Sequence, residues 1–163
     1  MNVQKFKMYS EVSGLSNSAL SLEELIHNGS DFLIKYDTFI QFLGYHDANK
    51  QEVYEGDVLE LKITDDLMNH DKDMFYNSNL GRCIEKEGDI TSVILVNKFE
   101  KTCMTMSYDV YFCRSGKIER DEDNDLIVEC CGVDANFPQY LCNKGAIVIG
   151  NTIVNKDLLE GMS

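Results

Sequence analysis

The sequence of 163 residues has no tryptophan, a single proline and only 15 basic residues against 28 acidic ones, which gives a formal net charge of −13. This shortage of basic side chains argues against a general nucleic-acid binder, because such proteins neutralise phosphates with Lys and Arg. It also disfavours docking on anionic membranes. An acidic surface instead suits solubility, cations or basic protein partners. The hydrophobic fraction of 44% is too high for a disordered chain and fits a compact globular domain.

Long apolar stretches are also missing from the sequence. No window approaches the roughly 18 consecutive apolar residues of a membrane-spanning helix. The first residues, Met1–Lys7, contain no apolar core of signal-peptide length. We therefore expect no membrane association and a cytoplasmic location.

The six cysteines lack the C-x-x-C spacing of common zinc sites. Without a signal peptide, a disulfide framework is not expected either. We expect these residues to be reduced and mostly buried as small hydrophobic side chains. They are Cys83, Cys103, Cys113, Cys130, Cys131 and Cys142.

Motifs of familiar catalytic chemistry are absent as well: the sequence has no glycine-rich phosphate loop, no G-x-S-x-G and no H-E-x-x-H. Asp121, Asp123 and Asp125 match the first ligand positions of a calcium loop. However, Leu126 and Gly132 stand where that loop needs Gly and Glu. We interpret the run as an acidic turn, and we predict no catalytic residue, no metal site and no cofactor.

What the sequence does contain is a β-rich pattern. Apolar and polar residues alternate over Val58–Ile63 and again over Met104–Cys113, which is typical of strands with one solvent-facing side. Short apolar runs separated by turn residues predict about six or seven strands, a pattern typical of a small barrel or sandwich. The other runs are 32–34, 39–43, 53–54, 81–86, 90–98, 126–131 and 146–149.

The first 36 residues differ from the rest. Ser21 and Glu24 have the spacing of a capping box, in which each side chain accepts a hydrogen bond from the backbone N–H of the other residue. This pattern predicts a short helix over about 18–27. We expect an N-terminal segment at 1–36 and a β domain at 37–163.

The most specific pattern in the sequence begins at Phe39. The run Glu52–Val58, EVYEGDV, resembles the EIYEGDIV run of the YopX family of phage and prophage proteins. A second run, Val148–Glu160, VIGNTIVNKDLLE, is similar to the closing VIGNIYENPELLE of that family. Lys50 departs from the family pattern, which usually has Gly at this turn position.

This resemblance implies a mainly β fold: an SH3-like small β-barrel with an irregular N-terminal segment that contains a short helix, and a short C-terminal helical turn. The motif residues have turn chemistry, because glycine adopts positive φ, Asp57 can accept backbone N–H groups and Asn155 can cap a helical turn. The resemblance supplies no catalytic residue. We assign a structural role to Gly44, Glu55, Gly56, Asp57, Gly150, Asn151 and Asn155.

The resemblance also implies a phage or prophage product that acts in the cytoplasm of the host bacterium. Residues 37–163 hold 24 of the 28 acidic side chains, so the acidic charge belongs to the predicted barrel. We expect a non-enzymatic accessory protein that contacts a basic host or phage protein, as an inhibitor of a host defence protein whose nucleic-acid groove it fills with carboxylates in place of phosphates. Direct nucleic-acid binding is not expected. The candidate partner-binding residues are Asp65, Asp66, Asp71, Asp73, Glu119, Asp121, Glu122, Asp123 and Asp125.

Two other classes of function stay open at this point. One is an oligomeric protein that binds a small ligand such as a nucleotide signal; its three arginines, Arg82, Arg114 and Arg120, would have to be gathered at an interface between copies. The other is a metal-dependent nuclease that uses the carboxylates of Asp65–Asp73 together with His70.

Overall fold

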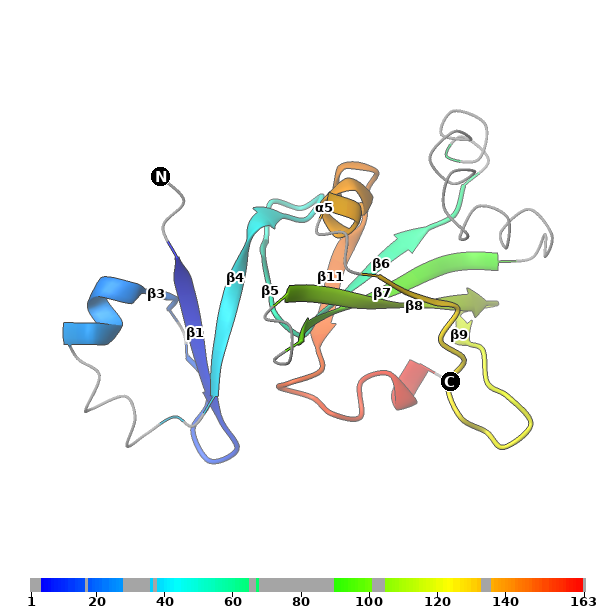
Figure 1. Cartoon of the computed structure of the whole chain (residues 1–163). Coiled ribbons are helices and arrows are strands. Elements are labelled where there is room, and N and C mark those ends of the chain that lie inside the picture. The colour runs from blue at the N-terminus through cyan, green and yellow to red at the C-terminus, as the bar shows by residue number, and fades with distance from the viewer. Residues whose placement is uncertain are drawn as a thin grey trace.

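Figure 1 shows the computed structural model of the chain, which describes residues 4–16, 18–27, 36, 38–64, 67, 90–100, 105–132 and 136–162. Residues 22–27 form a helix. The other elements are β1 (Lys5–Ser10), β2 (Gly14–Leu15), β3 (Leu20–Ser21), β4 (Thr38–His46), β5 (Glu52–Tyr54), β6 (Asp57–Lys62), β7 (Ile90–Glu100), β8 (Thr105–Arg114), β9 (Lys117–Ile118), β10 (Cys130–Gly132), α5 (Asn136–Asn143), β11 (Ile147–Asn151) and the 3-10 helix η1 (Glu160–Met162). The strands predicted at 32–34 and 81–86 lie outside the described residues.

The larger sheet has the strand order β10-β8-β7-β6-β11, with β9 paired to β8, and its strand pairs are antiparallel. Its central strand, β7, contains an apolar run without alternation over 93–96. Such a run is typical of a strand that is covered on both faces. Val93 and Leu95 lie in one core cluster, and Ile94 and Val96 lie in another on the opposite face.

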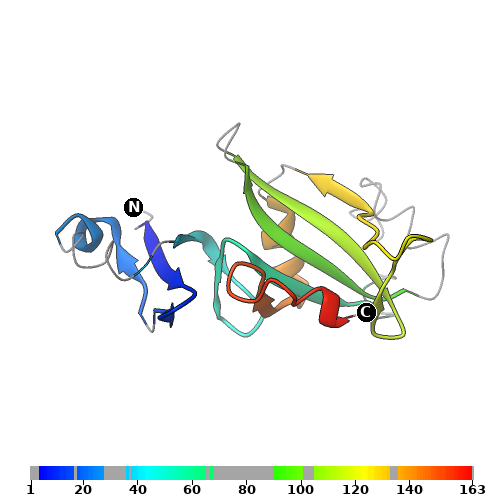
Figure 2. The same cartoon turned by 90° about the horizontal axis from the view of Figure 1, so that it is seen from below.

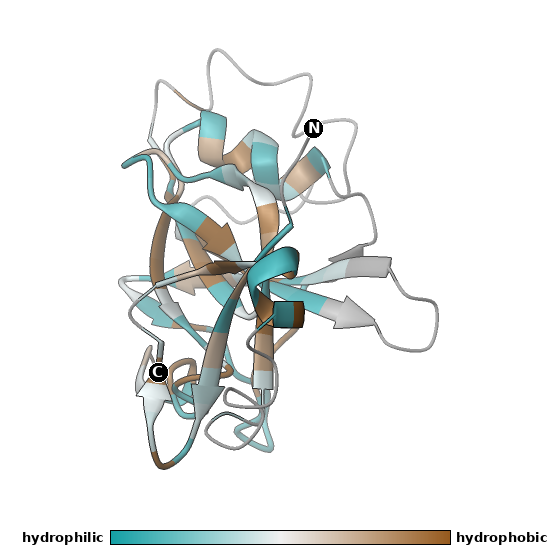
Figure 3. Ribbon diagram, turned by 90° about the vertical axis from the view of Figure 1, so that its left-hand side faces the viewer, coloured by the Kyte–Doolittle hydropathy of each residue, from teal (hydrophilic) through white to brown (hydrophobic). Residues whose placement is uncertain are grey.

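Different segments cover the two faces of this sheet. Leu141 of α5 belongs to the first cluster, whereas Leu158 and Leu159 of the C-terminal segment pack against the second. Hydrophobic residues recur along the strands of the sheets (Figure 3), and α5 buries Pro138, Leu141 and Cys142. Helix α5 was missed in the sequence analysis, although Pro138 in its first turn and the spacing of Phe137 and Leu141 are helix signals.

The smaller sheet has the order β2-β1-β4-β5, and β3 pairs with a different part of β1. Figure 2 shows its N-terminal strands set to one side of the larger sheet. The expected helix is present at 22–27, but β1 makes the N-terminal segment more regular than the sequence suggested. Strand β1 alternates lysines with apolar residues, and the lysine face packs on aromatic rings: the Lys7 ammonium lies 4.3 Å from the centroid of the Tyr54 ring.

The fold is mainly β, as the sequence predicted. It consists of two curled antiparallel sheets that form half-barrels, an arrangement consistent with a small β-barrel (Figure 1). Strand β4 connects the two parts, because one end pairs with β1 and the other with β5, immediately before β6 enters the larger sheet. The motif residues of the sequence analysis lie at this junction.

Candidate functional site

Motif residues from the middle and the end of the chain meet around Asp57. The carboxylate of Asp57 accepts hydrogen bonds from Tyr54 N and Asn151 Nδ2, each at 2.7 Å. Asp57 is only 6% exposed, and burial raises the pKa of its carboxyl to about 6 although both hydrogen bonds oppose the rise. A carboxyl enclosed in this way holds the turn before β6 against the end of β11 and presents no charge to a partner.

Close packing accounts for the glycines near Asp57. Gly56 has a φ of +77°, and a Cβ at this position would lie 2.7 Å from Ile153 Cγ1. A Cβ on Gly150 would lie 2.6 Å from Leu158 Cδ2. Gly44 has a φ of +89° and lies where the pairing of β4 with β5 shifts register. These positions therefore need glycine for backbone conformation or for space.

The remaining motif residues complete this junction. Asn151 Nδ2 also donates to the carbonyl of Glu55 at 2.8 Å, and Asn151 Oδ1 accepts from Ile153 N at 2.9 Å. Asn155 Oδ1 accepts from Asp157 N at 3.2 Å and so begins the turns that lead to η1. The arrangement fastens the C-terminal segment to the β5–β6 turn.

Asn97 belongs to the same network but was missed in the sequence analysis. Its Nδ2 donates to Asp57 O at 3.2 Å, and its Oδ1 accepts from the Tyr45 hydroxyl at 3.1 Å. Its carbonyl accepts from Gly56 N at 3.0 Å. The one signal in the sequence was an amide side chain directly after an apolar run. Asn97 is 2% exposed, and a polar side chain that is buried to this degree needs hydrogen-bond partners.

The loop Asp47–Gln51 between β4 and β5 is built on a second buried carboxylate. Asp47 Oδ1 accepts from Asn49 N and Gln51 N, both at 2.8 Å, and Asp47 Oδ2 accepts from Val148 N at 2.9 Å. Asp47 is 3% exposed. The fourth loop residue, Lys50, has a φ of +68°. The carboxylate therefore fixes both the shape of the loop and its position on β11.

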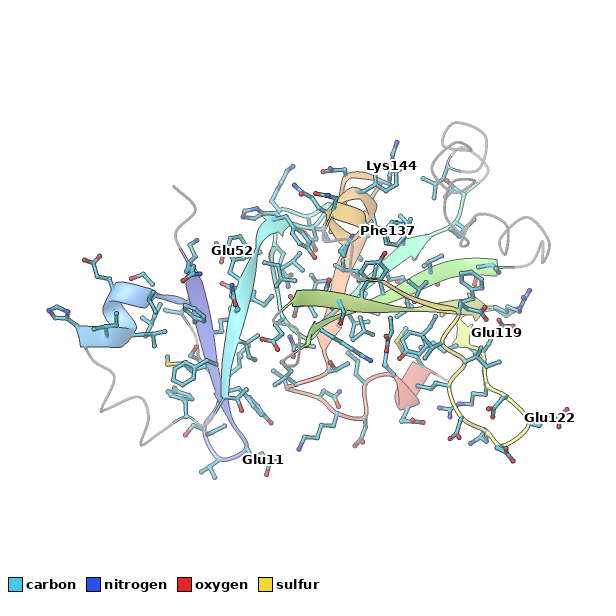
Figure 4. All side chains as sticks on the ribbon, in the orientation of Figure 1. Glu11, Glu52, Glu119, Glu122, Phe137 and Lys144 are labelled. Atoms are coloured by element: carbon cyan, nitrogen blue, oxygen red, sulfur yellow. The ribbon has the colours of Figure 1, made fainter. Side chains whose placement is uncertain are left out.

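The five acidic candidates that the structure describes lie in one exposed loop or at its base. Asp121 Oδ1 accepts from Asp123 N at 3.0 Å and from Asp125 N at 2.9 Å, which closes the loop. Glu119 forms an ion pair with Arg114 at the base of the loop. Glu122 extends from the tip, away from the sheets (Figure 4). The other candidates, Asp65, Asp66, Asp71 and Asp73, lie outside the described residues.

Arg120 contacts the base of this acidic loop, as Arg114 does through Glu119. Arg120 donates to the carbonyl of Asn124 at 2.6 Å and forms an ion pair with Glu160 of η1. The Arg120 side chain is only 16% exposed, so its charge is directed inward. The loop therefore presents negative charge to solvent, because Asp121, Glu122, Asp123 and Asp125 are all exposed.

An open cleft of about 490 Å³ lies between the Asp47–Gln51 loop and the C-terminal end of α5. Polar side chains dominate its lining. No sequence pattern pointed to this cleft, because its two walls come from segments about 90 residues apart. The lining residues are Gly44, Tyr45, His46, Asp47, Ala48, Lys50, Gln139, Cys142, Asn143 and Gly145.

The two cysteines whose side chains the structure describes do not form a reactive centre. Cys113 and Cys142 are free and buried, in line with the expectation for reduced hydrophobic side chains. Burial raises the pKa of the Cys142 thiol to about 12, so the thiol stays protonated near neutral pH and is a poor nucleophile. Within the described ranges, no three His, Cys, Asp or Glu side chains gather as a metal site would require.

None of the helices among the described residues has the length and apolar character needed to cross a bilayer. The family model described as YopX protein matches residues 4–160 of the chain. This match includes both β sheets and the C-terminal segment. No curated protein matches the sequence.

Proposed function

The chain belongs to the YopX family, and from this premise we propose that it is a phage or bacterial accessory protein that acts by binding another protein. The observation that carries the proposal is the exposed acidic loop Asp121–Asp125 on a chain with a net charge of −13. A surface of this charge favours a basic partner over nucleic acid or an anionic membrane.

The structure of the loop supports a role in recognition. Asp121 Oδ1 and one guanidinium nitrogen of Arg120 form hydrogen bonds with backbone groups of the loop and fix its shape. Carboxylates on a fixed backbone lose less conformational entropy on binding than the same carboxylates on a flexible tail. The loop thus presents Glu122, Asp123 and Asp125 in a preorganised arrangement.

The partner that fits this surface has a basic groove for nucleic acid. Lys and Arg side chains that neutralise phosphates can form the same charge-assisted hydrogen bonds with carboxylates. In this proposal the chain occupies such a groove in a host defence protein inside the bacterial cytoplasm, and nucleic acid is excluded by competition.

The test is affinity capture from a host lysate, followed by competition of the captured protein between its nucleic acid and the chain. The loop variant E122K/D123K is compared with E23K/D157K, which changes the net charge equally at exposed positions outside the loop. We expect the loop variant to lose at least tenfold in affinity and the control to stay within about twofold. Binding of the wild type should also weaken as salt increases.

A captured protein that binds the wild type and E122K/D123K equally would contradict the proposal. So would a partner whose nucleic acid binds undisturbed beside the chain.

A further inference from the structure

The cleft beside α5 is preformed. Figure 1 shows the β4–β5 connection reaching α5, and two backbone contacts fix it there: Ala48 N donates to Ala146 O at 3.0 Å, and Val148 N donates to the Asp47 carboxylate. Its volume of about 490 Å³ lies within the usual range for small-molecule sites. A ligand that entered would not have to order the walls first.

The charge of the cleft differs from that of the whole chain. Among the described residues that line it, Asp47 supplies the only carboxylate, and both Asp47 oxygens face backbone N–H groups. The exposed lining includes Lys50 and His46. The carboxamides of Gln139 and Asn143, one turn apart on α5, add hydrogen-bond donors. The exposed part of the lining therefore offers hydrogen-bond donors, and backbone N–H groups engage the one carboxylate.

Lys50 is in a backbone conformation that few side chains favour. Its φ of +68° lies in the left-handed region, where Gly or Asn is accommodated more easily. The hydrogen bonds of Asp47 within the loop impose this φ on the fourth loop residue, and Lys occupies the position in spite of it. The side chain placed here is a flexible cation at the edge of the cleft, and Lys binds phosphate as a point charge.

We propose that this cleft binds a small phosphate-bearing molecule of up to mononucleotide size, with Lys50 contacting the phosphate and the α5 carboxamides contacting the rest of the ligand. This site is independent of the acidic loop, so either proposal can fail without the other.

The experiment is a titration of the whole chain, followed by ¹H–¹⁵N NMR. The probes are inorganic phosphate, the four ribonucleoside 5′-monophosphates, glucose 6-phosphate, and adenosine as the ligand without phosphate. We expect at least one phosphate ester to shift the amide signals of the Asp47–Gln51 loop and of α5, and adenosine to give no such shifts.

Two variants and a matched control locate the contact. K50G removes the cation and relieves the backbone conformation, and Q139E places a carboxylate in the cleft; we expect both to weaken binding at least tenfold. The control N124G makes the same change of backbone freedom at the corresponding position of the acidic loop, where φ is +69°. It should bind within about twofold of the wild type.

Three results would overturn the proposal: no shifts with any phosphate probe at about 10 mM, adenosine binding as well as its monophosphate, or K50G binding as well as the wild type. A folded K50G is verified by its unshifted signals away from the loop.

Discussion

The loops Asp47–Gln51 and Asp121–Asp125 have the same internal design. In each, the first Asp accepts hydrogen bonds from the N–H groups two and four residues later, at 2.8 to 3.0 Å. In each, the first N–H donates to the fifth carbonyl at 2.9 Å. The fourth residue has a φ of +68° in one loop and +69° in the other.

The two loops differ in the second carboxylate oxygen. Asp47 Oδ2 accepts from Val148 N and the residue is 3% exposed, whereas Asp121 lies in an exposed loop. The same local chemistry thus serves two purposes. One loop fixes a wall of the cleft onto β11, and the other presents charge to solvent. Local turn chemistry determines the backbone, and the tertiary contact determines what the loop can do.

Removal of the two carboxylates tests this comparison most strongly. D47A leaves three N–H groups without their acceptor, two within the loop and one on β11, so we expect a loss of about 3 kcal/mol in the free energy of unfolding. D121A leaves N–H groups that water can reach, and we expect about 1 kcal/mol or less. Urea unfolding measures both values.

E122A is the control for these variants, because Glu122 is exposed at the tip of the acidic loop and its removal should change stability by less than about 0.5 kcal/mol. Equal losses for D47A and D121A would show that the contact with Val148 does not distinguish the loops.

Asp57 adds a third aspartate to the comparison, buried like Asp47 but with one backbone and one side-chain donor. Its pKa is raised from 3.8 to about 6. A raised pKa means that the folded chain binds the proton more tightly than the unfolded chain. The resulting stabilisation is complete below pH about 4 and is lost as the pH rises through about 6. We expect roughly 2 kcal/mol between these limits.

The measurement is the free energy of unfolding of the wild type and of D57N at pH 4, 5, 6 and 7. The wild type minus D57N difference should decline with increasing pH, because the carboxamide that D57N introduces does not titrate. D121N should keep the wild-type profile. A difference that is independent of pH would contradict the assignment of the raised pKa to Asp57.

Substitution of the fourth residue of each loop is expected to change the free energy of unfolding least. Lys in the left-handed region costs about 1 to 2 kcal/mol, and Gly adds about 0.5 to 1 kcal/mol of backbone entropy in the unfolded chain. We therefore expect K50G to raise the free energy of unfolding by about 0.5 kcal/mol and N124G to leave it nearly unchanged, since Asn adopts this conformation readily. Thermal unfolding monitored by circular dichroism would measure the two shifts. A destabilised K50G would mean that the Lys50 side chain contributes to the fold.

Much of the fold was predictable because strand signals are local. The runs at 39–43, 90–98 and 104–113 correspond to β4, β7 and β8, and the capping box at Ser21 and Glu24 forms with hydrogen bonds of 2.8 and 3.2 Å. Helix α5 was missed because its eight residues are short for a periodic pattern. The run at 126–131 was predicted as one strand, but only Leu126 forms a bridge before β10 begins at Cys130.

The candidate sites were less predictable because their contacts are long-range. The Asp47 carboxylate accepts a hydrogen bond from Val148 N, which is 101 positions later in the sequence. The Tyr45 hydroxyl donates to Asn97 Oδ1, which is 52 positions later. Within its own loop, Asp47 has the same sequence signal as Asp121: an Asp that begins a polar turn. Asp47 is buried because β11 lies against its loop, whereas Asp121 has no such neighbour among the described hydrogen-bond partners and is exposed.

The fastening of Asn151 to the β5–β6 turn also has a consequence for synthesis on the ribosome. Asn151 and Asp57 are 94 residues apart, and the second core cluster needs Leu158 and Leu159 to cover it. One face of strands β6 and β7 therefore stays exposed until residues 151–159 have emerged from the ribosome. At typical elongation rates of about 5 to 20 residues per second, this delay lasts several seconds. During that time the nascent chain offers an apolar surface to chaperones or to neighbouring chains.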